Sequence, residues 1–204
     1  MARIKMEQVE GIGRTALDKA IAEFMRHCRL RNLSPETLKY YEEDLIYFKK
    51  CIPIQYADEI CRERLEELII HEMDKGNRIT AINARVRGLR VFFRFCAERE
   101  YAEGFKFPLL KEDETMKEPY TDAELKKLLA RPNNSKWAEW RTWAIINTFL
   151  ATGIRASTLL NIRVADVDFE QSMVLLKKLK NRKQQYVPLS QSLKTALANA
   201  LLIC

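Results

Sequence analysis

The 204-residue chain is 47% hydrophobic and 31% charged, which is the composition of an ordinary folded protein and excludes a low-complexity chain. Only six glycines and six prolines argue against long disordered tracts, and no apolar run approaches the roughly 20 residues that a membrane-spanning helix requires. Lysine and arginine outnumber aspartate and glutamate by 35 to 28. The resulting charge of +7 favours a polyanionic partner, although a bland basic surface would explain it equally well.

The cysteines and histidines show no pattern of a metal site or a disulfide framework. Five cysteines are an odd number, and none belongs to a C-x-x-C pair. The two histidines, His27 and His71, lie far apart, and neither has cysteines at the spacing of a zinc finger. These spacings predict no metal site, and we expect no cofactor. Because no signal-like segment follows Met1, we also expect a protein of the reducing cytoplasm with free thiols.

Helical periodicity governs the N-terminal domain, residues 15–105, which follows a tail at residues 1–14. The first helix carries apolar residues at helical spacing from Leu17 to Cys28. Ser34 and Pro35 then provide the N-cap and the first-turn proline of a second helix. The domain is therefore expected to open with a helical pair.

Two further helices complete this domain. The third is predicted from Ile60 to Lys75 and ends at Gly76-Asn77, where a glycine can close a helix. Thr80 is expected to cap the fourth, which runs from Ala81 to Arg99. On this fourth helix, an apolar stripe and a polar stripe lie about 130° apart at 100° per residue. The polar stripe consists of Asn83, Arg87, Arg90 and Arg94.

A linker and a second domain are predicted to follow. Residues 106–118 combine prolines with the acidic run Glu112-Asp113-Glu114 and show little periodicity, which is typical of an interdomain linker. Thr121 and Glu124 have the spacing of a capping box, which predicts the first helix of a domain at residues 119–204.

The second domain is predicted to mix helices with a small sheet. An apolar helix from Trp137 to Ala151 holds three tryptophans, which we expect in the second core, and Gly153 ends or bends it. Three segments are expected to form an antiparallel sheet: Val167–Phe169, Met173–Lys178 and Gln185–Leu189. Ser190 caps a last helix that still runs at Cys204, and this pattern indicates truncation.

Two basic residues of this domain have the chemistry of a phosphate site. Arg155 follows the Gly153 break, and its planar, permanently charged fork suits two phosphate oxygens. A surface arginine paired with Asp166 or Asp168 is the alternative. Lys180, at the tip of the predicted hairpin, could donate a proton to a leaving oxygen, although a solvated turn lysine is equally consistent with its position.

Several motifs, taken together in this order, resemble the phage integrase, or tyrosine recombinase, family. Three of them come from the second domain: Thr152–Asn161, Asp166–Asp168 and Lys180–Ser190. Upstream, Leu33–Tyr41 and Asp44-Leu45 resemble the SAM-like core-binding domain of that family. The resemblance implies a mainly α protein, with a four-helix core-binding domain and an incomplete α+β catalytic domain that contains a three-stranded antiparallel sheet.

The resemblance also implies roles for single residues. Arg155 matches the first catalytic arginine, in the T-G-x-R motif, and Lys180 matches the hairpin lysine that donates the leaving-group proton. Lys178 is the fallback if the hairpin register is shifted. Thr158 stands where the family usually carries an acidic residue, which weakens the expected support for the arginine.

Three further catalytic elements of the family have no match in the chain. The H-x-x-R segment, a later histidine or tryptophan and the tyrosine nucleophile are missing. His27 and His71 cannot replace the histidine because both lie in the N-terminal domain, and Tyr186 is expected to pack against the sheet. We therefore expect the chain alone to be inactive, since a lost nucleophile leaves no covalent intermediate.

Double-stranded DNA is the partner that the resemblance implies, and no membrane partner is expected. The predicted DNA-binding residues are Thr37, Lys39, Arg78, Asn83, Arg85, Arg87, Arg90 and Arg94. The favoured hypothesis is a fragment of a recombinase that integrates or excises mobile DNA. The alternatives are a naturally short module that modulates a full-length recombinase and, last, a helical repressor. Leu193, Leu197 and Leu201 are expected to expose apolar surface that favours self-association.

Overall fold

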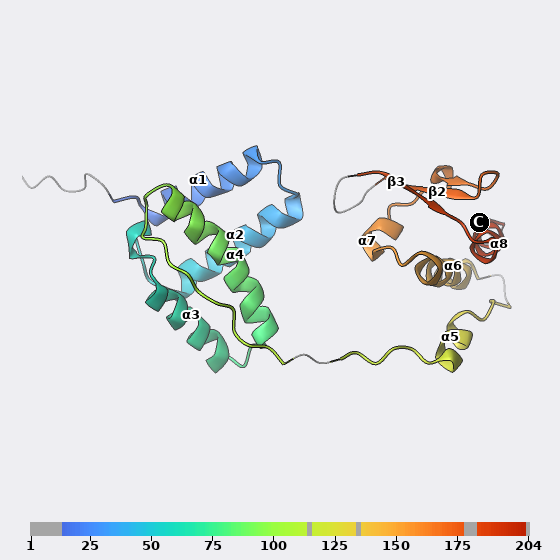
Figure 1. Cartoon of the computed structure of the whole chain (residues 1–204), viewed down its shortest axis with the longest axis horizontal. Coiled ribbons are helices and arrows are strands. Elements are labelled where there is room, and N and C mark those ends of the chain that lie inside the picture. The colour runs from blue at the N-terminus through green and yellow to red at the C-terminus, as the bar shows by residue number, and fades with distance from the viewer. Residues whose placement is uncertain (1–13, 114–115, 134–135, 178–182, 203–204) are drawn as a thin grey trace, which may run out of the picture. The chain divides into compact units, whose positions relative to one another are not determined.

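The computed structural model describes residues 14–113, 116–133, 136–177 and 183–202. The chain divides into two compact units, residues 1–115 and 116–204 (Figure 1). Within the described residues the structure is mainly helical and contains one small antiparallel sheet, so the predicted fold class is confirmed. In those same residues, every helix is too short or too polar to cross a membrane.

Four α-helices build the described part of the first unit. Their bounds are α1 Leu17–Leu30, α2 Pro35–Cys51, α3 Arg62–Asp74 and α4 Ile79–Glu98, with a short 3-10 helix, η1, at Ala57–Glu59. Helix α4 contacts each of the other three helices (Figure 1). The apolar stripe predicted for it is buried, as are the inward faces of its neighbours. One core therefore holds the four helices together.

The starts of α2 and α4 differ in how they are capped. Ser34 Oγ accepts a hydrogen bond of 3.2 Å from the backbone N–H of Thr37, as predicted. Helix α4, in contrast, begins at Ile79, and no side chain caps it. The prediction that Thr80 is the N-cap was wrong: the helix begins two residues earlier than expected, at Ile79, which packs against the core.

The chain after α4 folds back onto the first unit. Phe105 lies against Phe93, with 5.7 Å between ring centroids, and Phe107 is buried in the same core. Leu109 and Leu110 also pack against it. The first part of the predicted linker, residues 106–118, therefore packs on the first unit. The boundaries of the functional domains stay predictions.

The second unit combines short helices with the sheet. Its helices are α5 Asp122–Leu128, α6 Trp137–Thr152, α7 Ala156–Leu159, the 3-10 helix η2 Val164–Asp166 and α8 Gln191–Leu201. Its strands are β1 Val167–Asp168, β2 Met173–Leu176 and β3 Gln185–Pro188, in the antiparallel order β1-β2-β3. Val174 on the central strand pairs with Val167 on one side and Val187 on the other.

The helix caps and the helix-ending glycine predicted for the second unit are confirmed. The capping box of Thr121 and Glu124 is present, with Thr121 N–H donating to Glu124 at 2.8 Å. Gly153 ends α6 at φ +61°, a left-handed conformation that glycine adopts without strain. Ser190 caps α8 by accepting a hydrogen bond from the N–H of Leu193.

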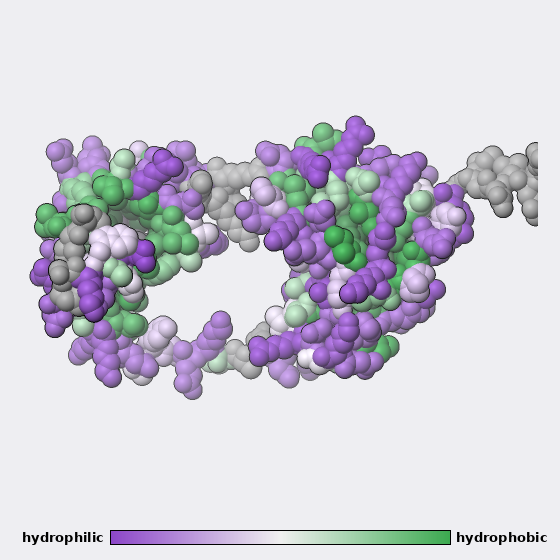
Figure 2. Space-filling model, turned by 180° about the vertical axis from the view of Figure 1, so that it is seen from behind, coloured by the Kyte–Doolittle hydropathy of each residue, from purple (hydrophilic) through white to green (hydrophobic). Residues whose placement is uncertain are grey.

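The apolar residues of the second unit depart from two expectations. Trp140 is buried, but Trp137 is 42% exposed because it opens α6 and lies beneath the guanidinium of Arg141 instead of in the core. Leu193 is buried with Val174, so it does not add to an exposed apolar surface. Figure 2 nevertheless shows hydrophobic residues exposed among hydrophilic ones on this unit.

Candidate functional site

The turn between α6 and α7 places Arg155 at a cleft. Because Gly153 reverses the chain after α6, Arg155 becomes the residue that precedes α7, with extended backbone angles and an exposed side chain. The cleft measures about 340 Å³ and is also lined by Leu176, Gln185 and Val187 of β2 and β3. Two segments that are distant in the sequence, the T-G-x-R turn and the hairpin strands, therefore form one site.

Neither aspartate that could neutralise Arg155 does so. Asp166 is buried, forms an ion pair with Lys177 and accepts a 3.0 Å hydrogen bond from the backbone N–H of Arg163. The hydrogen bond from Lys177 lowers the pKa of Asp166. Asp168 accepts instead from the N–H of Gln171 at 2.8 Å. Since Arg155 forms no ion pair with a carboxylate in the described ranges, its charge remains available to an external anion.

Other residues predicted near this site lie in different surroundings. Lys180 and its fallback Lys178 fall outside the described residues. Thr158 is buried one turn into α7, where its N–H donates to the carbonyl of Arg155 at 2.9 Å. Tyr186 is 62% exposed, so the prediction that it packs against the sheet was wrong. Strand alternation explains this: Val187 faces the small core, and Tyr186 therefore faces away.

The polar stripe of α4 is exposed at its three arginines. Arg87, Arg90 and Arg94 are all exposed and line one groove of about 500 Å³. Among the described residues, the ion pairs of Arg87 and Arg94 are long, at 3.9 Å to Glu112 and 3.8 Å to Glu98. Their outward orientation was predicted correctly, while their role as DNA contacts stays a prediction.

Asn83 departs from that stripe. It is 1% exposed, and its amide exchanges two hydrogen bonds of 2.9 Å with the backbone of Leu110. It also contacts the Glu112 carboxylate. The helical wheel placed Asn83 on the correct face of α4, but the prediction of an available side chain was wrong, because the returning chain covers that end of the face.

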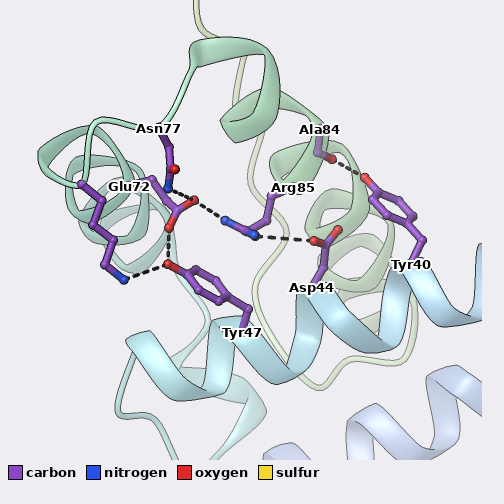
Figure 3. Close-up of polar contacts among 8 residues, drawn as sticks. Tyr40, Asp44, Tyr47, Glu72, Asn77, Ala84 and Arg85 are labelled. Atoms are coloured by element: carbon purple, nitrogen blue, oxygen red, sulfur yellow. Dashed lines mark hydrogen bonds and ion pairs between the residues drawn. The ribbon is translucent and has the colours of Figure 1, made fainter.

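Arg85 is likewise engaged inside the protein. Figure 3 shows it between Glu72 of α3 and Asp44 of α2. Its guanidinium also lies 3.9 Å from the ring centroid of Tyr47. The prediction that Arg85 contacts DNA conflicts with these contacts, since they already bind the guanidinium on both sides.

The surroundings of Arg85 form a polar network among three helices. Glu72, which is buried, accepts hydrogen bonds from Tyr47, Arg85 and Asn77 (Figure 3). The bond to Glu72 raises the pKa of Tyr47. Burial raises the pKa of Asp44 to about 6, because its 3.5 Å ion pair with Arg85 only partly offsets the loss of water.

The remaining predicted contacts are at the helix starts. Thr37 is half-buried, and its hydroxyl lies 3.1 Å from that of Ser34. Lys39 is exposed and forms an ion pair of 3.7 Å with Glu43. Arg78 is exposed immediately before α4.

Lys106 is a cation of the α4 groove that the sequence pattern did not predict as a site residue. Lys106 lines the groove together with the three exposed arginines of α4. It was assigned to the linker because the stretch lacks helical periodicity. The alternation of Phe105, Lys106 and Phe107 was the available signal, since a period of two indicates an extended segment with one buried face.

Comparison with known sequences identifies relatives along nearly the whole chain. The sequence model of the phage integrase family matches residues 120–204. The tyrosine recombinase XerC of Oceanobacillus iheyensis is 28% identical over 194 residues, which cover 91% of this chain and 63% of that protein. XerA of Pyrococcus furiosus is 27% identical over 188 residues, with coverages of 92% and 62%. The chain thus spans less than two thirds of the length of these relatives.

Solved structures share the fold. The Tn1549 transposon integrase in complex with a circular intermediate DNA superimposes with a TM-score of 0.75 at 18% identity, covering 92% of this chain and 65% of that one. A lambda integrase dimer bound to a COC′ core site gives a TM-score of 0.69 at 15% identity, covering 92% and 54%. The phage integrase, or tyrosine recombinase, family thus matches residues 120–204 of this chain, the Xer relatives extend the similarity over about nine tenths of its length, and the solved integrases share its fold.

Proposed function

We propose that this chain is a DNA-binding part of a site-specific tyrosine recombinase that integrates or excises mobile DNA in the cytoplasm. The observation that carries the proposal is Arg155, whose unneutralised guanidinium lines a cleft beside the hairpin strands. Residues 15–105 serve as the core-binding domain and residues 119–204 as the first part of the catalytic domain. The DNA complexes of the Tn1549 and lambda integrases support duplex DNA as the ligand.

The chemistry of the cleft suits phosphate transfer. A guanidinium can donate two parallel hydrogen bonds to non-bridging phosphate oxygens and stabilise the extra negative charge of a pentavalent transition state. Lys180 would supply the proton to the leaving oxygen, a role that rests on its place in the family motif. In this family the nucleophile is a tyrosine outside the motifs that this chain matches, and it forms a phosphotyrosyl bond with the DNA.

The 204-residue chain by itself binds DNA without cleaving it in this proposal. Gln185 and Val187 line the cleft, whereas Tyr186 between them does not. Alternation along the strand directs its ring away from Arg155. No histidine follows His71 in the sequence, so the second unit also lacks this acid–base group within the 204 residues. A full-length recombinase or a second copy of the chain is the partner expected at the DNA.

Titration of duplex DNA at several salt concentrations tests DNA binding. The double variant Arg87→Glu/Arg90→Glu should bind more weakly, and its salt slope should fall by about 2, since each phosphate contact contributes about 0.9. The matched control is Arg26→Glu/Lys50→Glu, which changes the net charge equally at exposed positions outside the groove. Unchanged affinity and slope in the groove variant would sink the proposal.

Covalent chemistry is tested separately with a nicked suicide substrate. We expect no protein–DNA adduct after denaturing electrophoresis, with a full-length tyrosine recombinase as the positive control. An adduct that disappears in Tyr186→Phe would overturn the inactive state proposed for this chain and identify the nucleophile.

A further inference from the structure

The groove on α4 has a second wall that does not belong to the helix. Helix α4 contributes Arg87, Arg90 and Arg94, and the returning chain contributes Lys106 between Phe105 and Phe107. The groove therefore presents cations from two sides, whereas a solvated helix face presents them from one.

This second wall is fixed at both ends. At its start, Gly104 passes so close to α4 that a Cβ there would lie 3.3 Å from the Cβ of Ala97. Phe105 packs against Phe93, and Phe107 is buried. Further along, the paired hydrogen bonds of Asn83 hold the backbone of Leu110. Lys106 consequently projects from an anchored segment, and holding it at the groove costs little extra conformational entropy.

The charges of the groove are incompletely neutralised. Among the described residues, Arg90 and Lys106 form no ion pair with a carboxylate. The two acidic residues that face the groove cations, Glu112 and Glu98, are 3.9 and 3.8 Å from their arginines. Exposed pairs of this length are worth about 1 kcal/mol or less, so an incoming anion can displace them.

The dimensions of the arginine row match a nucleic-acid strand. Seven residues separate Arg87 from Arg94, which corresponds to about 10 Å along a helix that rises 1.5 Å per residue. One DNA strand spaces its phosphates about 3.4 Å apart along the duplex axis, so the row covers about three of them. The apolar floor, which includes Val91 and Phe93, suits the uncharged faces of the deoxyribose rings.

We propose that the groove between α4 and residues 104–107 seats the phosphodiester backbone of duplex DNA, with Lys106 contacting a phosphate from the wall opposite the arginines. Asn83 is a positioning residue that holds this wall without touching the DNA. The inference rests on the proposed DNA-binding function and adds a second contacting segment to it.

The test compares two lysines of the same returning chain. Lys106→Gln removes the cation in the groove, and Lys111→Gln, the matched control, removes an exposed lysine outside it. In a titration of duplex DNA, Lys106→Gln should weaken binding about 5- to 10-fold at 0.1 M salt and lower the salt slope by about 1, irrespective of DNA sequence. Lys111→Gln should retain the wild-type affinity and slope.

The outcomes separate this inference from the function on which it rests. If Arg87→Glu/Arg90→Glu weakens binding but Lys106→Gln does not, DNA binding stands and the second wall is refuted. Equal losses in Lys106→Gln and Lys111→Gln would refute it as well, since they would reflect net charge alone. A poly-glutamate peptide that binds through Lys106 when DNA does not would identify an acidic protein segment as the occupant and overturn the proposal.

The positioning role of Asn83 has its own readout. Asn83→Ala should lower the salt slope to the value of Lys106→Gln, and the double variant should fall no further, because both changes remove the same contact. A purely structural role would lower the unfolding midpoint while leaving the slope of the folded protein unchanged. If Asn83→Ala fails to fold, the comparison of Lys106→Gln with Lys111→Gln still decides the proposal.

Discussion

Two faces of helix α4 use arginine in opposite ways. Arg85 and Arg87 are two residues apart, which places them 200° apart around the helix. Arg85 is 26% exposed in its side chain and lies between the carboxylates of Glu72 and Asp44. Arg87 is 54% exposed and has one ion pair of 3.9 Å. The first arginine joins three helices, and the second keeps most of its charge exposed to solvent. Whether the charge of an arginine is available to a ligand thus depends on the carboxylates within its reach. The number of basic residues on a helix does not determine this.

Removal of Arg85 is expected to have the largest effect on stability. Arg85→Ala leaves Glu72 and Asp44 buried without their cation, and breaking such a pair costs about 3 kcal/mol when the site is partly open to water. Arg87→Ala, on the opposite face, should change the free energy of unfolding by about 0.5 kcal/mol or less. Urea denaturation followed by circular dichroism measures both. Equal losses would remove the distinction between the two faces.

Gly88 tests how closely the network packs. A methyl group at this position would collide with Asp44 and would lie 3.1 Å from the hydroxyl of Tyr40. Gly88→Ala should therefore cost about 2 kcal/mol, although alanine normally stabilises a helix relative to glycine by about 1 kcal/mol. The same substitution in an Asp44→Ala background should cost less, because the main obstacle is gone. A stabilised Gly88→Ala protein would contradict the packing described for this network.

The pH dependence of stability follows from Asp44. Its pKa is raised from 3.8 to about 6 by burial, so the folded state prefers the protonated carboxyl. Stability from this group is complete below about pH 4 and is lost as the pH rises through 6, which amounts to about 1 kcal/mol between pH 5 and pH 7. The groups around it are Arg85, Tyr40 and Glu43. Asp44→Asn should remove this loss, and a variant with an unchanged pH profile would assign the dependence to another group.

Local chemistry decided which parts of the fold could be predicted from the sequence. The caps at Ser34 and Ser190 and the turn at Gly153 depend on neighbouring residues, and all three are present. The outward orientation of Arg87, Arg90 and Arg94 could also be predicted, because helical periodicity depends only on neighbouring residues. These features need no knowledge of the rest of the chain.

Contacts between distant segments decided what could not be predicted. Asn83 is covered by residues that follow it by 27 positions, and Arg85 pairs with Asp44, 41 positions earlier. Neither partner is visible in the periodicity of α4. The alternation of residues 105–107 indicates an extended segment, but its position beside α4 depends on contacts with Phe93 and Asn83, so the sequence did not place Lys106 at the groove. Contacts between distant segments thus removed Asn83 and Arg85 from the set of available side chains and placed Lys106 beside the exposed arginines.

The second unit offers the smallest but most specific test of the same distinction. There Asp166 is held by Lys177, while Arg155 at its cleft has no ion pair with a carboxylate among the residues that the structure describes. Arg155→Ala should lower the salt slope of DNA binding by about 1 and weaken binding a few-fold, as expected for one lost phosphate contact. Arg141→Ala is the matched control, because that arginine lies over the ring of Trp137 and lines no part of the cleft.

The variant Arg155→Lys separates the charge of Arg155 from its hydrogen-bonding geometry. If Arg155 binds a phosphate, then Arg155→Lys should restore the salt slope, because the charge returns, but only part of the affinity, because lysine lacks the planar fork that donates two parallel hydrogen bonds. Full restoration by lysine would reduce Arg155 to a point charge on the surface of the cleft. Loss of slope in Arg141→Ala as well would show that an arginine stacked on an aromatic ring is as available to DNA as an unpaired one.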